Sequence, residues 1–230
     1  MRSIGIIVAG GSGRRMNGGL RKQYRRLAGV PILGRTLAVF DACRDINGIV
    51  LAVPFEDITY CLRSVIDPLP LKKPVRVIAG GAERQESVYN GLLAAAEEGA
   101  ELTVIHDGVR PFVSVEAISQ SIQGAVKTGA CILGIPSFDT VKEVDEDGRI
   151  KQTLCRKRMW LAQTPQAFRI ELILAAHEAA RREGFRGTDD ASLVERLGKP
   201  VMVIPGSRRN IKITTPEDLL FARALLELHP

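Results

Sequence analysis

The sequence has 230 residues, of which 45% are hydrophobic and 25% charged, the composition of a globular protein and not of a disordered or fibrous one. Four widely spaced cysteines form no C-x-x-C pair, which argues against a structural zinc site and a secreted disulfide framework and indicates a reducing cytoplasm. No apolar run is long enough to cross a bilayer, so we expect no membrane partner. A net charge of +6 favours anionic partners, and an aromatic content of only 5% argues against nucleic acid.

Short β-branched runs alternate along the chain with amphipathic segments. The runs predicted to be buried strands are residues 3–9, 48–53, 75–79, 102–106, 130–136 and 201–205. Apolar residues at helical spacing predict helices around residues 33–40, 88–95 and 115–125. This alternation predicts an α/β fold with a doubly wound, mostly parallel sheet and helices on both faces, in a single domain of residues 1–230.

Residues 137–163 interrupt the alternation. Within them, residues 140–144 and 149–154 flank the turn sequence Asp-Glu-Asp-Gly and are predicted to form a β-hairpin. A hairpin that projects from a sheet domain leaves apolar residues such as Val144 and Ile150 without a core to cover them. We therefore expect an inserted arm that forms a homodimer.

Two more helices are predicted before the end of the chain, over residues 170–182 and 189–197, with Thr188 as the N-cap of the second. The final helix has the clearest start signal. Thr215 stands at the cap position, Pro216 at the first helical position, and two acids follow in the first turn.

The first predicted strand leads into a glycine-rich loop, Ala-Gly-Gly-Ser-Gly-Arg-Arg-Met, and residues 14–26 then hold six cations and no acid. Ligands of open α/β sheets bind at the carboxyl ends of strands, and glycine lets backbone N–H groups approach phosphate oxygens, so the loop favours phosphate binding over a plain tight turn. Arg15 and Lys22 would add charge where phosphoryl or nucleotidyl transfer accumulates negative charge. Met16 breaks the dinucleotide fingerprint, and no Gly-Lys pair completes a Walker loop.

Two further segments end strands at the same predicted sheet edge. Asp107 is a candidate Mg²⁺ ligand, with a turn cap as its alternative role, and His106 beside it is expected to be a core histidine. Residues 80–87 open a helix whose backbone could contact a base or ribose. Cys155 has no nearby histidine base and is expected to be structural.

Seven sequence blocks carry a resemblance to one family. They are A-G-G-S-G-R-R-M with K-Q at 22–23, G-G-x-x-R-x-x-S at 80–87, H-D-x-x-R-P at 106–111, D-T at 139–140, Q-T-P-Q at 163–166, T-D at 188–189 and N-I-K-I-T-x-P-E-D-L at 210–219. Across nearly the whole chain they resemble 2-C-methyl-D-erythritol 4-phosphate cytidylyltransferases. The resemblance implies a Rossmann-like nucleotidyltransferase fold and a requirement for Mg²⁺. It also implies an enzyme of non-mevalonate isoprenoid synthesis that joins CMP from CTP to the sugar-alcohol phosphate and releases pyrophosphate.

The resemblance also implies roles for individual residues. The catalytic residues would be Arg15, Lys22 and Lys212. The nucleotide would be contacted by Ala9, Gly10, Gly11, Ser12, Gly13, Gly81, Ala82, Ser87, Asp107 and Gly108, with Asp107 also at the metal. The acceptor phosphate would be held by Arg110, Thr140, Thr188 and, from a partner's arm, Arg156. The chain departs from the family pattern at Gly10, Arg21 and Arg209; Arg21 stands where proline is usual.

Two alternatives stay open. Ribitol 5-phosphate cytidylyltransferase shares most of these blocks and differs mainly in its acceptor, although the Gly-Arg-Arg-Met form of the loop favours methylerythritol phosphate. A non-catalytic nucleotide- or RNA-binding module of the same fold would predict loss of Lys22, Asp107 or Lys212, and all three are present.

Overall fold

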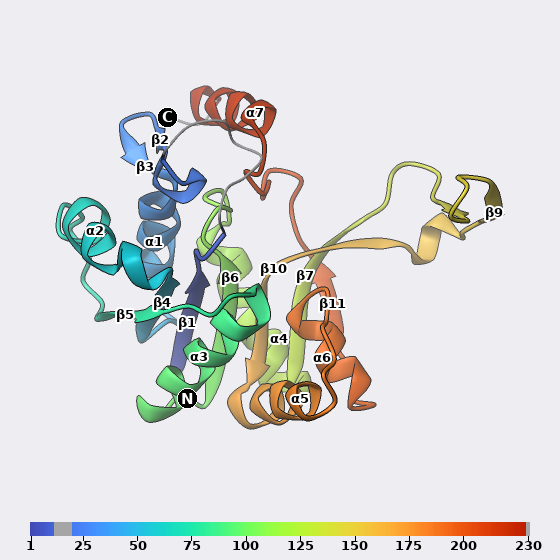
Figure 1. The fold of residues 1–230 in the computed structure, drawn as a ribbon, viewed down its shortest axis with the longest axis horizontal. Helices are drawn as coiled ribbons and strands as arrows, with labels where there is room; N and C mark the ends of the chain where they lie inside the picture. The colour runs from blue at the N-terminus through green and yellow to red at the C-terminus, as the bar shows by residue number, and fades with distance from the viewer. Residues whose placement is uncertain (12–19, 229–230) are drawn as a thin grey trace.

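The computed structural model describes residues 1–11 and 20–228. Within these residues the central sheet has seven strands in the order β11–β7–β10–β6–β1–β4–β5 (Figure 1). Their bounds are β1 Ser3–Val8, β4 Gly48–Val53, β5 Val75–Ala79, β6 Leu102–Asp107, β7 Ala130–Pro136, β10 Trp160–Arg169 and β11 Met202–Pro205. Within this sheet β10 is antiparallel to both of its neighbours, and the other strand pairs are parallel. The predicted doubly wound, mostly parallel sheet is confirmed.

Helices cover both faces of this sheet (Figure 1). One face packs on α3 (Arg84–Glu97), α5 (Ile170–Arg182) and α6 (Asp190–Arg196), and the other on α1 (Ile32–Ala42) and α4 (Val115–Thr128). Because β1 is buried on both sides, Ile6 joins the first core and Ile7 the second. α7 (Pro216–Glu227) covers a third, smaller hydrophobic cluster, which lies beyond the carboxyl end of β1.

The two edge strands differ from their prediction as buried strands. β5 is only partly buried, and in β11 Met202 and Val203 are exposed. Both strands have a neighbour on one side only, so less of their surface is covered. β10 was not predicted. It inserts between β6 and β7 and takes in residues 160–163, the last residues assigned to the arm.

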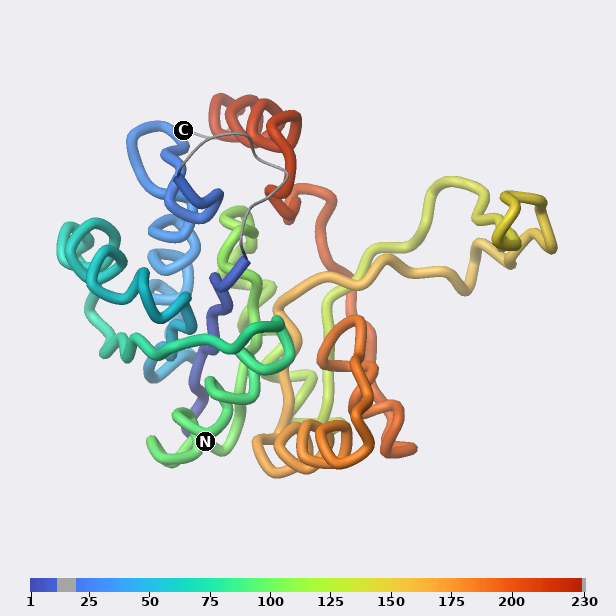
Figure 2. The backbone as a smooth tube through the Cα atoms, in the orientation of Figure 1, coloured from blue at the N-terminus to red at the C-terminus, as the bar shows by residue number. Residues whose placement is uncertain are grey.

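The predicted hairpin is confirmed. β8 (Lys142–Val144) pairs antiparallel with β9 (Ile150–Thr153), and together they form an arm that extends away from the sheet and its helices (Figure 2). Val144 and Ile150 are 49% and 63% exposed. The arm therefore leaves its apolar side chains uncovered by its own chain, as expected.

Short elements complete the fold: η1 (Lys22–Tyr24), β2 (Arg26–Leu27), β3 (Val30–Pro31), η2 (Phe55–Asp57), α2 (Ile58–Cys61), η3 (Leu62–Ile66) and η4 (Arg156–Arg158). α7 begins as predicted, with Thr215 in a capping box. The predicted Thr188 cap of α6 is wrong, because the Asp189 carboxylate accepts the Ser192 backbone N–H at 3.0 Å instead. Over the described residues, no helix has the length and apolar character needed to span a membrane.

Candidate active site

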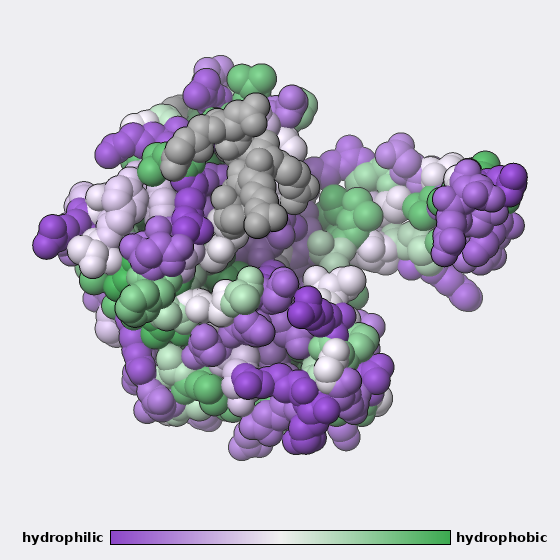
Figure 3. Space-filling view, in the orientation of Figure 1, coloured by the Kyte–Doolittle hydropathy of each residue, from purple (hydrophilic) through white to green (hydrophobic). Residues whose placement is uncertain are grey.

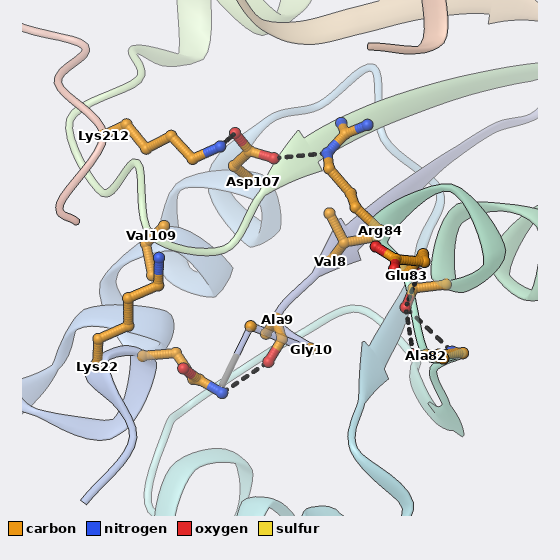
Figure 4. A pocket seen from close by; sticks show the side chains of 14 residues that line it. Val8, Ala9, Gly10, Lys22, Ala82, Glu83, Arg84, Asp107, Val109 and Lys212 are labelled. Carbon is orange, nitrogen blue, oxygen red and sulfur yellow. Dashed lines mark hydrogen bonds and ion pairs between the residues drawn. The ribbon is translucent and has the colours of Figure 1, made fainter. Parts of the chain in front are cut away.

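A pocket of about 530 Å³ lies at the carboxyl ends of β1 and β6, beside the start of α3 (Figure 4). Nine predicted site residues line it: Ala9, Gly10, Gly11, Lys22, Gly81, Ala82, Ser87, Asp107 and Lys212. Ser12, Gly13 and Arg15 lie outside the described residues. The topology thus gathers segments from four distant parts of the sequence at the sheet edge where ligands of α/β folds bind.

The wall at the start of α3 requires glycine and is held by side chains of the helix itself. A Cβ at Gly81 would lie 2.3 Å from the Cβ of Glu86. The Gly81 N–H donates to the Ser87 hydroxyl at 3.1 Å, and the Ala82 N–H donates to a Glu86 carboxylate oxygen at 2.8 Å. These bonds hold the backbone of residues 81–82 in the wall of the pocket. The predicted contact of this backbone with a base stays a prediction.

Gly108 lies behind the pocket and does not line it. Its N–H donates to the Val8 carbonyl at 2.9 Å, and a Cβ at this position would lie 2.9 Å from Leu33 Cδ1. Gly108 therefore allows the chain after β6 to pass close to the end of β1. Its predicted contact with the nucleotide stays a prediction.

Lys22 reaches the pocket from η1 (Figure 4). Its Cε lies 3.5 Å from the point where a Cβ on Gly11 would stand, so the side chain passes directly over the glycine backbone. The next residue, Gln23, is buried and donates from Nε2 to the Ala9 carbonyl at 2.7 Å. This bond fastens η1 to the end of β1 and holds the lysine beside the glycine segment.

Asp107 is the centre of a cluster of cations. Its carboxylate pairs with Lys212 Nζ at 2.9 Å, Arg84 Nε at 3.1 Å and Arg110 Nε at 3.6 Å. Burial alone would raise the pKa of Asp107, but Arg84 and Lys212 outweigh it and hold that pKa well below its usual range. Asp107 is therefore ionised, and it organises the positive charge of this wall.

Arg84 was not among the predicted site residues, although it is the arginine of the G-G-x-x-R-x-x-S block. Its Nη2 pairs with Asp190 Oδ2 at 2.8 Å, and the other Asp190 oxygen lies 3.4 Å from His177 Nε2. Asp190 and His177 are fully buried. Arg84 therefore connects the pocket to the buried carboxylate of Asp190. The sequence signal for Arg84 was its place in the G-G-x-x-R-x-x-S block, and that for Asp190 was its place directly after Thr188-Asp189.

Thr164 and Asn210 also were not predicted, and they join the distant segments of the site. Asn210 Nδ2 donates to the Thr164 carbonyl at 2.7 Å, and Arg110 Nη1 donates to the Asn210 carbonyl at 2.7 Å. Lys212 follows Asn210 by two residues. These bonds place the Lys212 segment against β10 and the loop after β6.

His106 is a core histidine, as predicted. Its Nε2 faces the Arg110 carbonyl at 3.1 Å and its Nδ1 faces the Thr164 hydroxyl at 3.0 Å, while that hydroxyl accepts the Asp107 N–H at 3.1 Å. A carbonyl only accepts, so Nε2 carries the proton and Nδ1 accepts from Thr164. Burial lowers the pKa of His106 to about 4, and the ring supports the loop without entering the pocket.

The predicted acceptor residues are not together within one chain. Arg110 pairs with Asp107 but does not itself line the pocket. Thr188 is an exposed residue before α6, and Thr140 and Arg156 are on the arm. Arg156 Nη1 donates to the Phe138 carbonyl at 2.8 Å. Cys155 is exposed, which does not fit the structural role expected for it.

The donor set fits a Mg²⁺ ion shared with a phosphate chain. No group of three or more metal-binding side chains occurs in residues 1–11 and 20–228, so these residues form no metal cage. Asp107 does present a buried, ionised carboxylate to the pocket, and Mg²⁺ is commonly held by one or two carboxylates together with substrate phosphates.

The family model for 2-C-methyl-D-erythritol 4-phosphate cytidylyltransferase matches residues 4–228. This chain belongs to the 2-C-methyl-D-erythritol 4-phosphate cytidylyltransferase family. It is 50% identical over 224 residues to the enzyme of that name from Syntrophus aciditrophicus, covering 97% of this chain and 95% of the relative. It is 49% identical over 222 residues to the Geobacillus thermodenitrificans enzyme, covering 96% and 95%.

A solved structure supports the same family assignment. The 4-diphosphocytidyl-2C-methyl-D-erythritol synthase of Anaerococcus prevotii matches with a TM-score of 0.88 at 35% identity, covering 98% of this chain and 96% of that one. The predicted family and the nucleotidyltransferase fold are confirmed.

Proposed function

We propose that this chain transfers CMP from CTP to 2-C-methyl-D-erythritol 4-phosphate, releasing pyrophosphate, in the pocket at the ends of β1 and β6. An oxygen of the acceptor phosphate attacks the α-phosphorus of CTP, and the bond to the β-phosphate breaks. The observation that carries the proposal is the convergence of Lys22, Lys212 and the Gly10–Gly11 backbone on one pocket in a chain of this family. Their presence together also favours an enzyme over a non-catalytic binding module.

The cationic side chains would stabilise the charge that develops as the phosphorus becomes five-coordinate. Lys22 and Lys212 reach the pocket from η1 and from the segment before α7 (Figure 4). Arg15 would join them from the glycine loop. Once the substrate is bound and these groups face it, they lower the barrier because they need no further reorganisation during the reaction. Gly81 and Ala82 would contact the cytosine, with Ala82 offering only its backbone.

We propose that Asp107 shares a Mg²⁺ ion with the triphosphate; when bound, the ion would neutralise the phosphate charge and orient the chain. Lys212 would then leave Asp107 for the substrate, and its side chain is 40% exposed. Asp107→Asn removes the anionic charge but keeps the shape. We expect this variant to need more Mg²⁺ for half-maximal activity, and an unchanged requirement would limit Asp107 to organising the cations.

We also propose that the arm completes the acceptor site of a second copy. Hydrophobic side chains lie exposed near its root, including Phe138, Trp160 and Leu161, whereas the tip is mostly hydrophilic on the face drawn in Figure 3. A second copy would cover these side chains and bring Arg156 to an acceptor phosphate that Arg110 binds from the other chain.

All four cysteines are free, which supports a cytoplasmic location.

Pyrophosphate release with CTP and each acceptor tests the activity. We expect methylerythritol phosphate to be preferred over ribitol 5-phosphate by at least about tenfold in kcat/KM, or roughly 1.4 kcal/mol. Lys22→Ala should lose on the order of a hundredfold or more in turnover, and Lys199→Ala, an exposed lysine outside the pocket, should lose none. Equal use of ribitol 5-phosphate would overturn the acceptor, and a fully active Lys22→Ala would overturn the role of the lysine.

Mixing two inactive variants tests the shared site. In a mixed dimer of Lys22→Ala and Arg156→Ala, one site combines an intact Lys22 with the partner's intact arginine. Activity should therefore reappear on mixing, up to about a quarter of the wild-type value if subunits exchange at random. No recovery in a verified mixed dimer, or full activity of a monomer in sedimentation experiments, would exclude the shared site.

A further inference from the structure

We infer that Arg21 is a positioning residue for Lys22: its ion pairs to η2 fix the backbone from which the lysine reaches the pocket. The inference rests on the function proposed above for Lys22.

The Arg21 side chain forms a fork between two acids of η2. Its Nη2 lies 2.5 Å from Glu56 Oε1, and its Nε lies 2.9 Å from Asp57 Oδ2. The side chains of Arg21 and Asp57 are 27% and 16% exposed, so solvent screens the second pair only in part. Because η2 begins two residues after β4 ends at Val53, this fork attaches Arg21 to the central sheet.

The residues on the other side of Lys22 are also fixed. Gln23 is bonded to the Ala9 carbonyl, and Tyr24 is buried with its ring 5.0 Å from that of Tyr60 in an edge contact. Lys22 stands between these anchors and the fork of Arg21. Fixing the backbone on both sides limits the positions that its ammonium group can reach, which favours catalysis when the charge must meet one developing anion.

The backbone angles of Arg21 explain how an arginine serves here. Arg21 adopts φ −59° and ψ 145°. A proline ring would hold φ near the same value covalently. Arginine has no ring that restricts φ. Its two ion pairs to η2 instead hold the backbone of Arg21 in this conformation through tertiary contacts.

A direct contact between Arg21 and the nucleotide is the competing explanation, and removal of the acids distinguishes the two. The double variant Glu56→Gln with Asp57→Asn keeps the Arg21 charge and releases it from η2. A direct contact predicts that turnover is retained or increased. Positioning predicts that turnover falls as far as it does in Arg21→Gly.

The test compares kcat and KM for CTP in the full-length chain, together with Tm. We expect Arg21→Gly and the double acid variant each to lose about tenfold in kcat, with KM within about twofold and Tm lowered by only a few degrees. Arg21→Pro should stay within about threefold of wild type, since proline keeps this φ. Arg76→Ala is the matched control: it breaks an exposed ion pair between Arg76 on β5 and Glu97 on α3, and the variant should remain fully active.

Wild-type kcat in the double acid variant, or Arg21→Pro as impaired as Arg21→Gly, would overturn the inference. Lys22→Ala is measured alongside. If that variant keeps normal turnover, the proposed role of Lys22 fails. If it is impaired while Arg21→Gly is not, only the positioning role of Arg21 fails.

Discussion

His106 is expected to stay neutral in the folded protein at neutral and mildly acidic pH. The imidazole is fully buried between the Arg110 carbonyl and the Thr164 hydroxyl, and burial lowers its pKa from 6.5 to about 4. In the unfolded chain the ring is solvated and its pKa returns to about 6.5. Acidification must therefore favour the unfolded state, which can bind a proton that the folded state excludes.

The size of this effect follows from the two pKa values. One pKa unit corresponds to about 1.36 kcal/mol, so the folded protein should lose roughly 3 kcal/mol through His106 as the pH falls from about 7 to 4. Because folding lowers the pKa of His106, the unfolded state binds more protons than the folded state between pH 6.5 and about 4. The free energy of unfolding therefore rises with pH across this window. Below about pH 4 both states are protonated and the loss ends.

Denaturant unfolding of the wild type and of His106→Gln, from pH 4 to 7.5, measures this contribution. The difference in unfolding free energy between the two proteins should shrink by roughly 3 kcal/mol towards pH 4, because only the wild type carries this titrating ring. Nitrogen chemical shifts should show a neutral ring protonated at Nε2 down to about pH 5. A folded-state pKa near 6.5, or a proton on Nδ1, would refute the reasoning.

Three further predictions concern other parts of the chain. Asp190→Asn should lower the unfolding free energy by about 2–3 kcal/mol at pH 7, since it removes a charged partner of Arg84. Arg84 and His177 outweigh burial and lower the pKa of Asp190, so the difference in unfolding free energy between wild type and variant should narrow as the pH falls below about 4. A difference that stays constant with pH would argue against this cause. Thr215→Ala should cost about 1 kcal/mol, seen as a Tm lower by about 2–4 °C with unchanged kcat, and an unchanged Tm would exclude the cap. In the native protein a thiol reagent should label Cys155 alone among four cysteines, and rapid labelling of a second would contradict the burial of the others.

Much of the fold follows from local sequence. The predicted ranges 48–53, 75–79 and 130–136 match β4, β5 and β7, and 170–182 matches α5. Each of these elements is one continuous segment whose apolar residues follow the pattern of a strand or a helix. Glycine or proline lies at or next to most of their ends. The start of α7 was predictable for the same reason, because a cap depends on residues only three apart.

Other parts of the fold depend on neighbours that are distant in sequence. β10 contains Pro165 and lacks a regular apolar alternation, and it is a strand because β6 and β7 offer it hydrogen bonds on both sides. The partial exposure of β5 and β11 depends on their places at the sheet edges, which strand order decides.

For the site, the sequence by itself indicated the kinds of residue: a glycine segment after the first strand, Lys22 as a cation suited to a phosphate ligand, and Asp107 as a candidate metal ligand. Lys212 was indicated only through the family resemblance. Only the tertiary structure decided how they are joined. It brought Lys212 to Asp107 and linked Arg84 to both Asp107 and Asp190. An ion pair depends on the distance between two groups in space, and between residues so far apart in sequence only the packed topology sets that distance.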